Sequence, residues 1–173
     1  GGTPPVTAGT LSPCPPCTYT VNAQGVKVVS GYVMTNAQIA DDANVRSQLR
    51  GVTVNNTACT TGGTSGCTNM NGLAPSVVQG LNGLAADCTT CSGIMVTGGT
   101  EGGHKTHRPG VPIVDIAPSP ELNKFLNAPA NPLNNGRAIV TLKNGRRAVM
   151  VYERAGGGSA GTSTGDHWHV TFE

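Results

Sequence analysis

The order of secondary-structure patterns along the chain most constrains its fold. Helical patterns come early, over about 36–49 and 75–87, whereas alternating strand patterns come late, over 137–142 and 147–153. The Asn144-Gly145 dipeptide between the last two patterns is typical of a tight hairpin turn. Helices and strands that are segregated in this way predict an α+β domain with a small, mostly antiparallel sheet and two or three helices.

Local signals indicate where these elements begin and end. Thr35 or Asn36 is expected to cap the first helix, and Gly51 to follow its last turn. Pro75 suits the first turn of the second helix, whose apolar stripe consists of Val77, Val78, Leu81 and Leu84. Shorter elements are expected as a hairpin within 19–33, strands at 52–54, 94–97, 111–116 and 168–172, and a helix at 120–127.

The six cysteines fall into three close pairs: Cys14/Cys17, Cys59/Cys67 and Cys88/Cys91. An even number of cysteines in a Thr/Asn/Gly-rich chain is typical of an exported protein with disulfides. We expect Cys59 and Cys67 to close a local loop, and the other four to form either local bridges or one long-range bridge. The alternative is a zinc ribbon built from the two CxxC motifs, although such motifs usually lie only about 15 to 20 residues apart.

Composition argues against several classes of partner. The net charge is +2 and 12% of the residues are charged, so we expect no nucleic-acid partner. No apolar run approaches the roughly 20 residues that cross a bilayer, so we expect no transmembrane segment. Together with the cysteine pairs, this predicts a secreted or cell-surface protein, extracellular or periplasmic, whose export signal was removed before Gly1.

The chain is expected to consist of an arm and one domain. Residues 1–18 are rich in Pro, Gly, Thr and Ser, which predicts either an extended arm or disorder. A third possibility is that this arm pairs with the sheet edge of a neighbouring subunit and so supports self-assembly. Residues 19–173 are expected to form the single α+β domain.

All four histidines lie in two stretches that also contain carboxylates, residues 98–116 and residues 165–173. In the second stretch, His167 and His169 are two positions apart on an expected strand, so both side chains point to the same face. A regular strand would direct Asp166 to the opposite face, unless a bulge at the loop edge re-aims it.

Imidazole and carboxylate groups bind zinc in tetrahedral geometry, and catalytic zinc sites use three protein ligands. Asp115 lies on an expected strand, and a turn before that strand would fold His107 back beside it. We therefore predict a zinc site with His107, Asp115 and His169 as ligands. His104 is an alternative ligand; otherwise His104 and Glu101 are expected to orient the ligands by hydrogen bonding.

These residues resemble the motifs of the zinc D-Ala-D-Ala carboxypeptidase and L-Ala-D-Glu endopeptidase family, whose fold is shared with hedgehog signalling domains. The family pattern S-x-H-x-x-G-x-A-x-D-I is similar to residues 106–116, and its later (E/D)-x-x-H is similar to residues 166–169. The resemblance covers residues 70–173, with the peptidase-like motifs within 93–173.

The resemblance implies a hedgehog-like fold and a zinc-dependent peptidase that acts on peptidoglycan stem peptides, as a D,D-carboxypeptidase or an L,D-endopeptidase. It implies the same three ligands, His107, Asp115 and His169. It also implies that Asp166 is the general base, which activates water together with the zinc.

Two departures from the family pattern concern spacing and the base. Seven residues, 108–114, separate His107 from Asp115, where the family has six, so one extra residue must be absorbed as a bulge. The base is Asp166, whereas glutamate is commoner in the family and is one methylene longer.

A third departure concerns the charge that stabilises the reaction. The family's Ser-Gly-Tyr-Arg is replaced by Thr-Gly-Gly-Thr at residues 97–100, so the arginine that stabilises developing negative charge is missing. Lys105, Arg108 or His167 is a candidate substitute, and we therefore include His167 among the candidate catalytic residues.

The alternative interpretation is a structural or binding protein on the cell exterior. The low charge, the Thr/Asn/Gly-rich surface, the N-terminal arm and the missing arginine favour a catalytically degenerate subunit of a filament or surface assembly that retains the peptidase fold. A third class would hold zinc and bind cell-wall peptides without cutting them. Trp168 and Phe172 are interpreted as core residues rather than as a surface that stacks on substrate.

Overall fold

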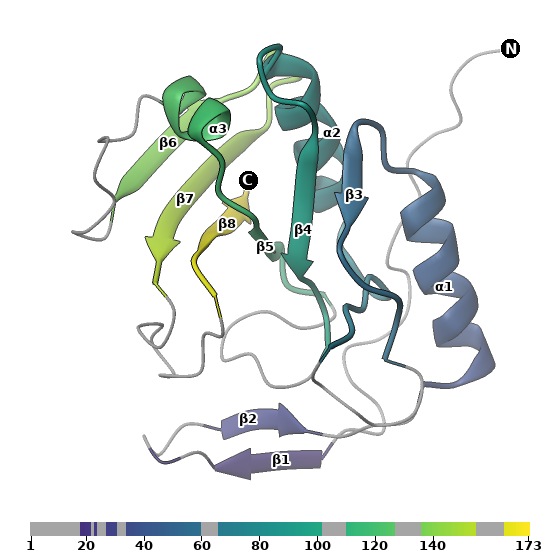
Figure 1. The fold of residues 1–173 in the computed structure, drawn as a ribbon. Helices are drawn as coiled ribbons and strands as arrows, with labels where there is room; N and C mark the ends of the chain where they lie inside the picture. The colour runs from purple at the N-terminus through teal and green to yellow at the C-terminus, as the bar shows by residue number, and fades with distance from the viewer. Residues whose placement is uncertain are drawn as a thin grey trace, which may run out of the picture.

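The computed structural model describes residues 18–21, 23, 27–30, 34–59, 66–101, 110–126, 136–154 and 165–173. It contains a two-stranded sheet of order β1-β2 and a six-stranded sheet of order β3-β4-β5-β8-β7-β6. In the larger sheet β3 and β4 are parallel, and the other neighbouring pairs are antiparallel (Figure 1). The expected α+β class with a mostly antiparallel sheet is therefore confirmed.

The elements follow one another as β1 (Thr18–Val21), β2 (Lys27–Ser30), α1 (Asn36–Ser47), β3 (Val52–Val54), α2 (Pro75–Asp87), β4 (Ile94–Gly98), β5 (Ile113–Ile116), α3 (Pro120–Phe125), β6 (Arg137–Thr141), β7 (Arg147–Glu153) and β8 (His167–Phe172). The expected 19–33 hairpin is the antiparallel β1–β2 pair. The expected arm, 1–18, lies outside the described residues except for Thr18, which begins β1.

Helix α1 begins as its sequence predicts and ends earlier. The Thr35 hydroxyl accepts a hydrogen bond from the Gln38 amide at 3.2 Å, and the Thr35 amide donates to Gln38 Oε1 at 2.8 Å, which completes a capping box. The last helical residue is Ser47, and Gln48 closes the helix by donating to carbonyls of the preceding turn. Gly51, with a φ of +68°, instead forms the turn into β3, so its predicted place directly after the helix is wrong.

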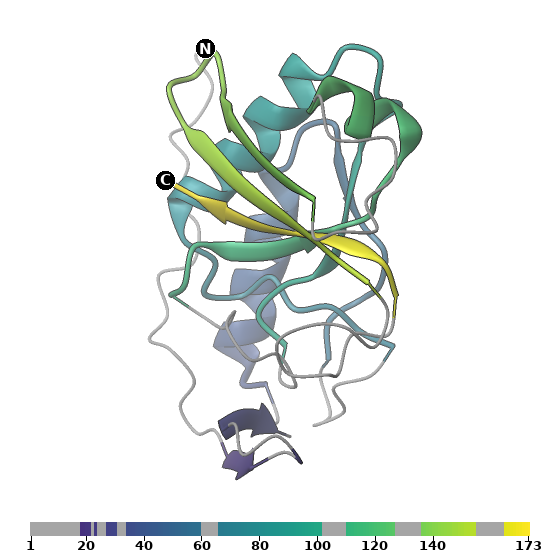
Figure 2. The same cartoon turned by 90° about the vertical axis from the view of Figure 1, so that its left-hand side faces the viewer.

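Helix α2 covers one face of the six-stranded sheet, where it contacts β3, β4 and β8 (Figures 1 and 2). Its predicted apolar stripe is fully buried: Val77, Val78, Leu81 and Leu84. The helix packs so closely that a Cβ at Gly80 would lie 2.1 Å from the Phe172 ring. A glycine is therefore required at this crossing, where the backbone itself contacts the aromatic ring.

The two faces of the sheet differ in character because strand residues alternate. On β7 and β8 the positions facing α2 and α3 are buried: Ala148, Met150, Tyr152, Trp168, Val170 and Phe172. Trp168 is fully buried, and its indole N–H donates to Asn123 Oδ1 at 2.8 Å, which confirms that Trp168 belongs to the core. The intervening positions of β7 and β8 therefore point to the opposite face, which we call the open face.

Two disulfides connect described cysteines. Cys59–Cys67 is present as predicted, and Cys88–Cys91 forms a local bridge. Because the thiols of Cys88 and Cys91 are oxidised, they are not ligands of a zinc ribbon; Cys14 and Cys17 lie outside the described residues.

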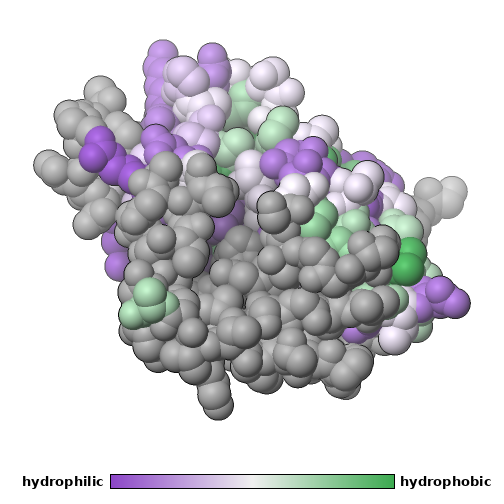
Figure 3. All heavy atoms as spheres, turned by 60° about the horizontal axis from the view of Figure 1, so that its bottom comes forward, coloured by the Kyte–Doolittle hydropathy of each residue, from purple (hydrophilic) through white to green (hydrophobic). Residues whose placement is uncertain are grey.

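The surface of the described residues is mixed in polarity. On the face shown in Figure 3, hydrophilic and hydrophobic residues with described positions are interspersed. Of the helices in the described ranges, none is both long enough and apolar enough to span a bilayer.

Candidate metal-binding site

Four titratable side chains meet on the open face, close to where β7 ends and β8 begins. In the strand register Asp115 of β5 is the direct partner of His169 of β8, and His167 of β8 is the partner of Glu153 of β7. Direct cross-strand partners point to the same face of a sheet. We refer to Asp115, Glu153, His167 and His169 as the open-face cluster.

Short contacts join the members of this cluster. Asp115 Oδ1 lies 3.3 Å from His169 Nδ1 and 3.5 Å from His167 Nε2. His167 Nε2 also lies 3.0 Å from Glu153 Oε2. Asp115 and His167 are both largely buried, at 5% and 9% exposure, so these charges interact with little screening by water. The structure thus brings together three of the residues predicted from sequence, Asp115, His167 and His169.

The ring of His167 is held at both nitrogens. Its Nδ1 lies 2.9 Å from the Gly165 carbonyl oxygen, which is an acceptor, so this nitrogen donates. Its Nε2 faces the Glu153 carboxylate. Burial lowers the pKa of His167, but the hydrogen bond to Glu153 and the charge of Asp115 outweigh burial and raise the pKa to about 9. His167 is therefore a fixed cation of the cluster in the absence of a metal.

Glu153 is a member of the cluster that the sequence patterns did not predict. The hydrogen bond from His167 lowers the pKa of Glu153, and the positive charge on the histidines contributes further, against an opposing effect of burial. The position of Glu153 on its strand was the only indication in the sequence: Glu153 follows Val149 and Val151 at every second residue, and these residues point to the open face. The β7–β8 register was needed to place it opposite His167.

The predicted base Asp166 lies just before β8 and is exposed. The Tyr152 hydroxyl donates to Asp166 Oδ2 at 3.3 Å, and the Tyr152 ring packs edge-to-face on Trp168 with centroids 5.1 Å apart. Burial and the charge of Asp166 raise the pKa of Tyr152. This hydrogen bond places the Asp166 side chain beside Tyr152, which belongs to the core face of the sheet. Strand alternation also directs Asp166 to the core face, because the next residue, His167, points to the open face.

Glu101 is 4% exposed and accepts hydrogen bonds from backbone amides, from Asn69 at 3.0 Å and from Gly99 at 2.9 Å. It therefore holds backbone at the end of β4. His104 and His107, the other predicted ligands, lie outside the described residues.

The cluster fits two ligands of a tetrahedral zinc ion. Zinc bonds nitrogen and oxygen at about 2.0–2.1 Å, and two ligands at the tetrahedral angle are then about 3.3 Å apart. The Asp115 Oδ1 to His169 Nδ1 separation is 3.3 Å. Within the described ranges, no group of three or more His, Cys, Asp or Glu side chains is arranged to hold a metal ion. A third ligand would therefore come from outside these ranges, where the predicted ligand His107 lies.

The resemblance to the peptidase family rests on two sequence motifs alone, residues 106–116 and 166–169. No family model, no curated protein and no solved structure matches the chain.

Proposed function

We propose that the chain is a zinc-dependent peptidase that acts on peptidoglycan stem peptides. The observation that carries the proposal is the 3.3 Å contact between Asp115 and His169, on neighbouring strands, at the separation expected of two zinc ligands. His107 would be the third ligand. The likeness of residues 106–116 and 166–169 to the peptidase motifs supports the same assignment.

Each neighbouring residue has a proposed part in the reaction. When bound, zinc supplies a Lewis acid for the scissile carbonyl and for activating water. Asp166, once its exposed side chain has left the Tyr152 hydroxyl and turned to the open face, would take the proton from the attacking water and pass it to the leaving amine. His167, 3.5 Å from Asp115 Oδ1, supplies the positive charge that the missing family arginine would have provided, and Glu153 holds the His167 ring in place.

The open face offers a surface for an extended peptide beside the cluster. One cross-strand row there consists of Ile139, Val149, Thr171 and Ile113. Ile139 is 53% exposed, so apolar surface on this row is accessible to a ligand. The adjacent row contains Arg137, Val151, His169 and Asp115, so a peptide that crosses the strands would contact apolar side chains and the proposed zinc ligands together.

Arg137 supports a substrate with a free C-terminal carboxylate. Arg137 is exposed and lies two strands from His169 along the same row, which corresponds to about 10 Å. An extended residue spans about 3.3–3.6 Å, so the carboxylate of the residue after the scissile bond would meet the guanidinium where the long Arg137 side chain extends along this row toward His169. This favours the carboxypeptidase type of activity over the endopeptidase type.

The two disulfides are consistent with an oxidising location. We propose that the protein works in the periplasm or on the cell exterior, where peptidoglycan is located. A structural disulfide would be reduced in the cytosol, so this location agrees with the substrate that we propose.

The proposal is tested by incubating the protein with zinc and two synthetic stem peptides, one ending in D-Ala-D-Ala and one with an internal L-Ala-D-Glu bond. Mass spectrometry of the products should show release of one D-alanine from the first peptide, and excess chelator should abolish the release. Zinc binding without cleavage of either peptide would contradict the peptidase proposal and would instead support the catalytically degenerate surface subunit.

A further inference from the structure

Residues 66–72, together with 55–59, form an irregular segment that is held by carboxylates rather than by a strand ladder. The amide of Gly72 donates to Asp41 at 2.7 Å, that of Met70 to Asp42 at 2.6 Å, and that of Asn69 to Glu101 at 3.0 Å. Asp42 and Glu101 are buried, at 5% and 4% exposure. Charged acceptors of this kind make strong hydrogen bonds, so the segment has a defined position without regular structure.

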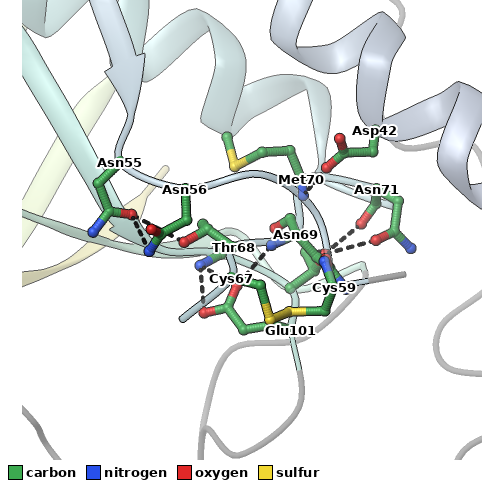
Figure 4. The surroundings of a disulfide bond; sticks show 12 residues. Asp42, Asn55, Asn56, Cys59, Cys67, Thr68, Asn69, Met70, Asn71 and Glu101 are labelled. Atoms are coloured by element: carbon green, nitrogen blue, oxygen red, sulfur yellow. Dashed lines mark hydrogen bonds between the residues drawn. A yellow bond between two sulfur atoms is a disulfide. The ribbon is translucent and has the colours of Figure 1, made fainter. Parts of the chain in front are cut away.

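The Cys59–Cys67 disulfide joins the two parts of this segment, and Cys59 also contacts Asn69 (Figure 4). The amide of Cys59 donates to the Asn69 side-chain oxygen at 2.6 Å, and Asn69 is 1% exposed. The disulfide therefore fixes the backbone that contacts a buried side chain. Asn69 is hydrogen-bonded both to Cys59 of the disulfide and to Glu101 (Figure 4).

Asn69 in turn holds the residues that follow β4. Its carbonyl accepts from the Thr100 amide at 2.6 Å, and Glu101, which accepts from Asn69, also accepts from the Gly99 amide at 2.9 Å. The backbones of Gly99 and Asn69 lie so close together that a Cβ at Gly99 would be 2.1 Å from the Asn69 carbonyl oxygen. We call Asn69, Gly99, Thr100 and Glu101 the clamp.

The clamp lies next to the candidate zinc ligand Asp115. Gly98 at the end of β4 is the cross-strand partner of Asp115, and the β4–β5 register shifts between Val96 and Gly98. Because the β4–β5 hydrogen-bond ladder is irregular there, the position of Gly98 relative to Asp115 depends on the contacts that hold residues 99–101. The same segment also reaches the approach to β5, since the Gly110 amide donates to the Gly72 carbonyl at 2.9 Å.

We propose that the Cys59–Cys67 disulfide and the clamp are positioning elements for Asp115, and that zinc affinity at the open-face cluster depends on this disulfide. This inference rests on the proposed zinc site. Positioning groups outside the ligand set typically change metal affinity by about 10–100-fold when they are removed.

The second disulfide provides a matched control. Cys88–Cys91 also closes a short loop, but it precedes β4, which begins at Ile94, whereas the clamp follows the end of that strand. The pair Cys59→Ser/Cys67→Ser should weaken zinc binding by about 10–100-fold in competition with a chromophoric chelator. The pair Cys88→Ser/Cys91→Ser should leave the affinity within about threefold of the unmodified protein.

A second pair of variants keeps the test valid if loss of the disulfide prevents folding. Glu101→Gln removes the charge that the clamp uses, and Asp87→Asn removes a carboxylate that also accepts from a backbone amide, that of Lys143, outside this segment. Glu101→Gln should weaken zinc binding and alter the visible spectrum of bound cobalt, because the coordination of Asp115 changes. Asp87→Asn should leave that spectrum unchanged.

The outcomes separate this inference from the proposed function. Zinc binding that is equally strong in all four variants, or equally weakened in both cysteine pairs and in both carboxylate variants, would overturn the positioning role while leaving the zinc site intact. Failure of the unmodified protein to bind zinc would overturn the proposed function and this inference together.

Discussion

Asp115 of β5 and His169 of β8 are direct cross-strand partners, with Oδ1 and Nδ1 3.3 Å apart on the open face of the sheet. The two residues are 54 positions apart in sequence and are brought together by strand pairing alone. Rigid strands hold side-chain donors more accurately than loops do, which suits a metal site.

Asp166 is the residue whose replacement should separate catalysis from zinc binding. Because Asp166 is the proposed base and not a ligand, Asp166→Asn should lower kcat by about 10²–10⁴-fold on the D-Ala-D-Ala peptide, with zinc affinity retained. The matched control is Glu173→Gln. Glu173 lies just after β8, and this substitution removes the carboxylate that pairs with Arg147 of β7. Equal activity of Asp166→Asn and the unmodified protein would show that another group is the base, with Glu153 the first candidate.

Arg137 should determine the preference for a free C-terminus. Removal of its guanidinium by Arg137→Gln should raise KM about tenfold or more for a peptide with a free carboxylate, because a charge-assisted hydrogen bond contributes about 1.5–3 kcal/mol. The same substitution should change KM little for the C-terminally amidated peptide. A similar effect on both peptides would contradict a role in carboxylate recognition.

His167 should make the stability of the metal-free protein depend on pH. Its pKa is raised from 6.5 to about 9 by Glu153 and Asp115, so its stabilising contribution is complete below about pH 6.5 and is lost as pH rises through about 9. Because the Glu153 side chain is 22% exposed, water screens its charge in part, and we expect the loss to be about 1–2 kcal/mol. Urea denaturation with chelator present would measure it.

The control for that pH dependence is Glu153→Gln. The groups that face the His167 ring are the Glu153 and Asp115 carboxylates and the Gly165 carbonyl, and this substitution removes the nearest charge. The loss of stability between pH 6.5 and 9 should therefore become clearly smaller. An unchanged pH profile in Glu153→Gln would show that another group is responsible.

The crossing of α2 and β8 should be intolerant of any side chain at Gly80. A Cβ there would lie 2.1 Å from the buried Phe172 ring, so Gly80→Ala should lower the free energy of unfolding by about 2–3 kcal/mol. At Gly165 no atom lies within 4 Å of an added Cβ, so Gly165→Ala should change it by less than about 0.5 kcal/mol. Equal stability of the two variants, measured by thermal unfolding, would contradict the packing described.

Most of the fold could be predicted from local signals. The Thr35 cap, Pro75 and the α2 stripe define their helices by short-range chemistry, and the Asn144-Gly145 turn defines the β6–β7 hairpin. The end of α1 was wrong because Gly51 has a positive φ, which suits a turn as well as a helix end. Asp41 and Asp42 of α1 accept hydrogen bonds from the amides of Gly72 and Met70, and helical periodicity contains no signal of these long-range contacts.

The candidate site was predictable in part for the same reason. The two-residue spacing of His167 and His169 indicated that both side chains point to one face. The likeness to the family motifs indicated Asp115 and His169 as ligands, because residue types and short spacings are local signals. Glu153 was missed because its place depends on the register between β7 and β8. The clamp was missed because a segment without periodicity contains no signal of its tertiary hydrogen bonds.

Asp115 and His169 are the two proposed zinc ligands that lie within the described residues. The most direct test is the zinc content and affinity of the unmodified protein, of Asp115→Asn, of His169→Gln and of Glu173→Gln, each stripped with chelator and titrated with zinc. We predict one zinc per chain in the unmodified protein and in Glu173→Gln, and an affinity lower by more than about 100-fold in the other two. Absence of zinc from the unmodified protein, or the same affinity in all four, would contradict it.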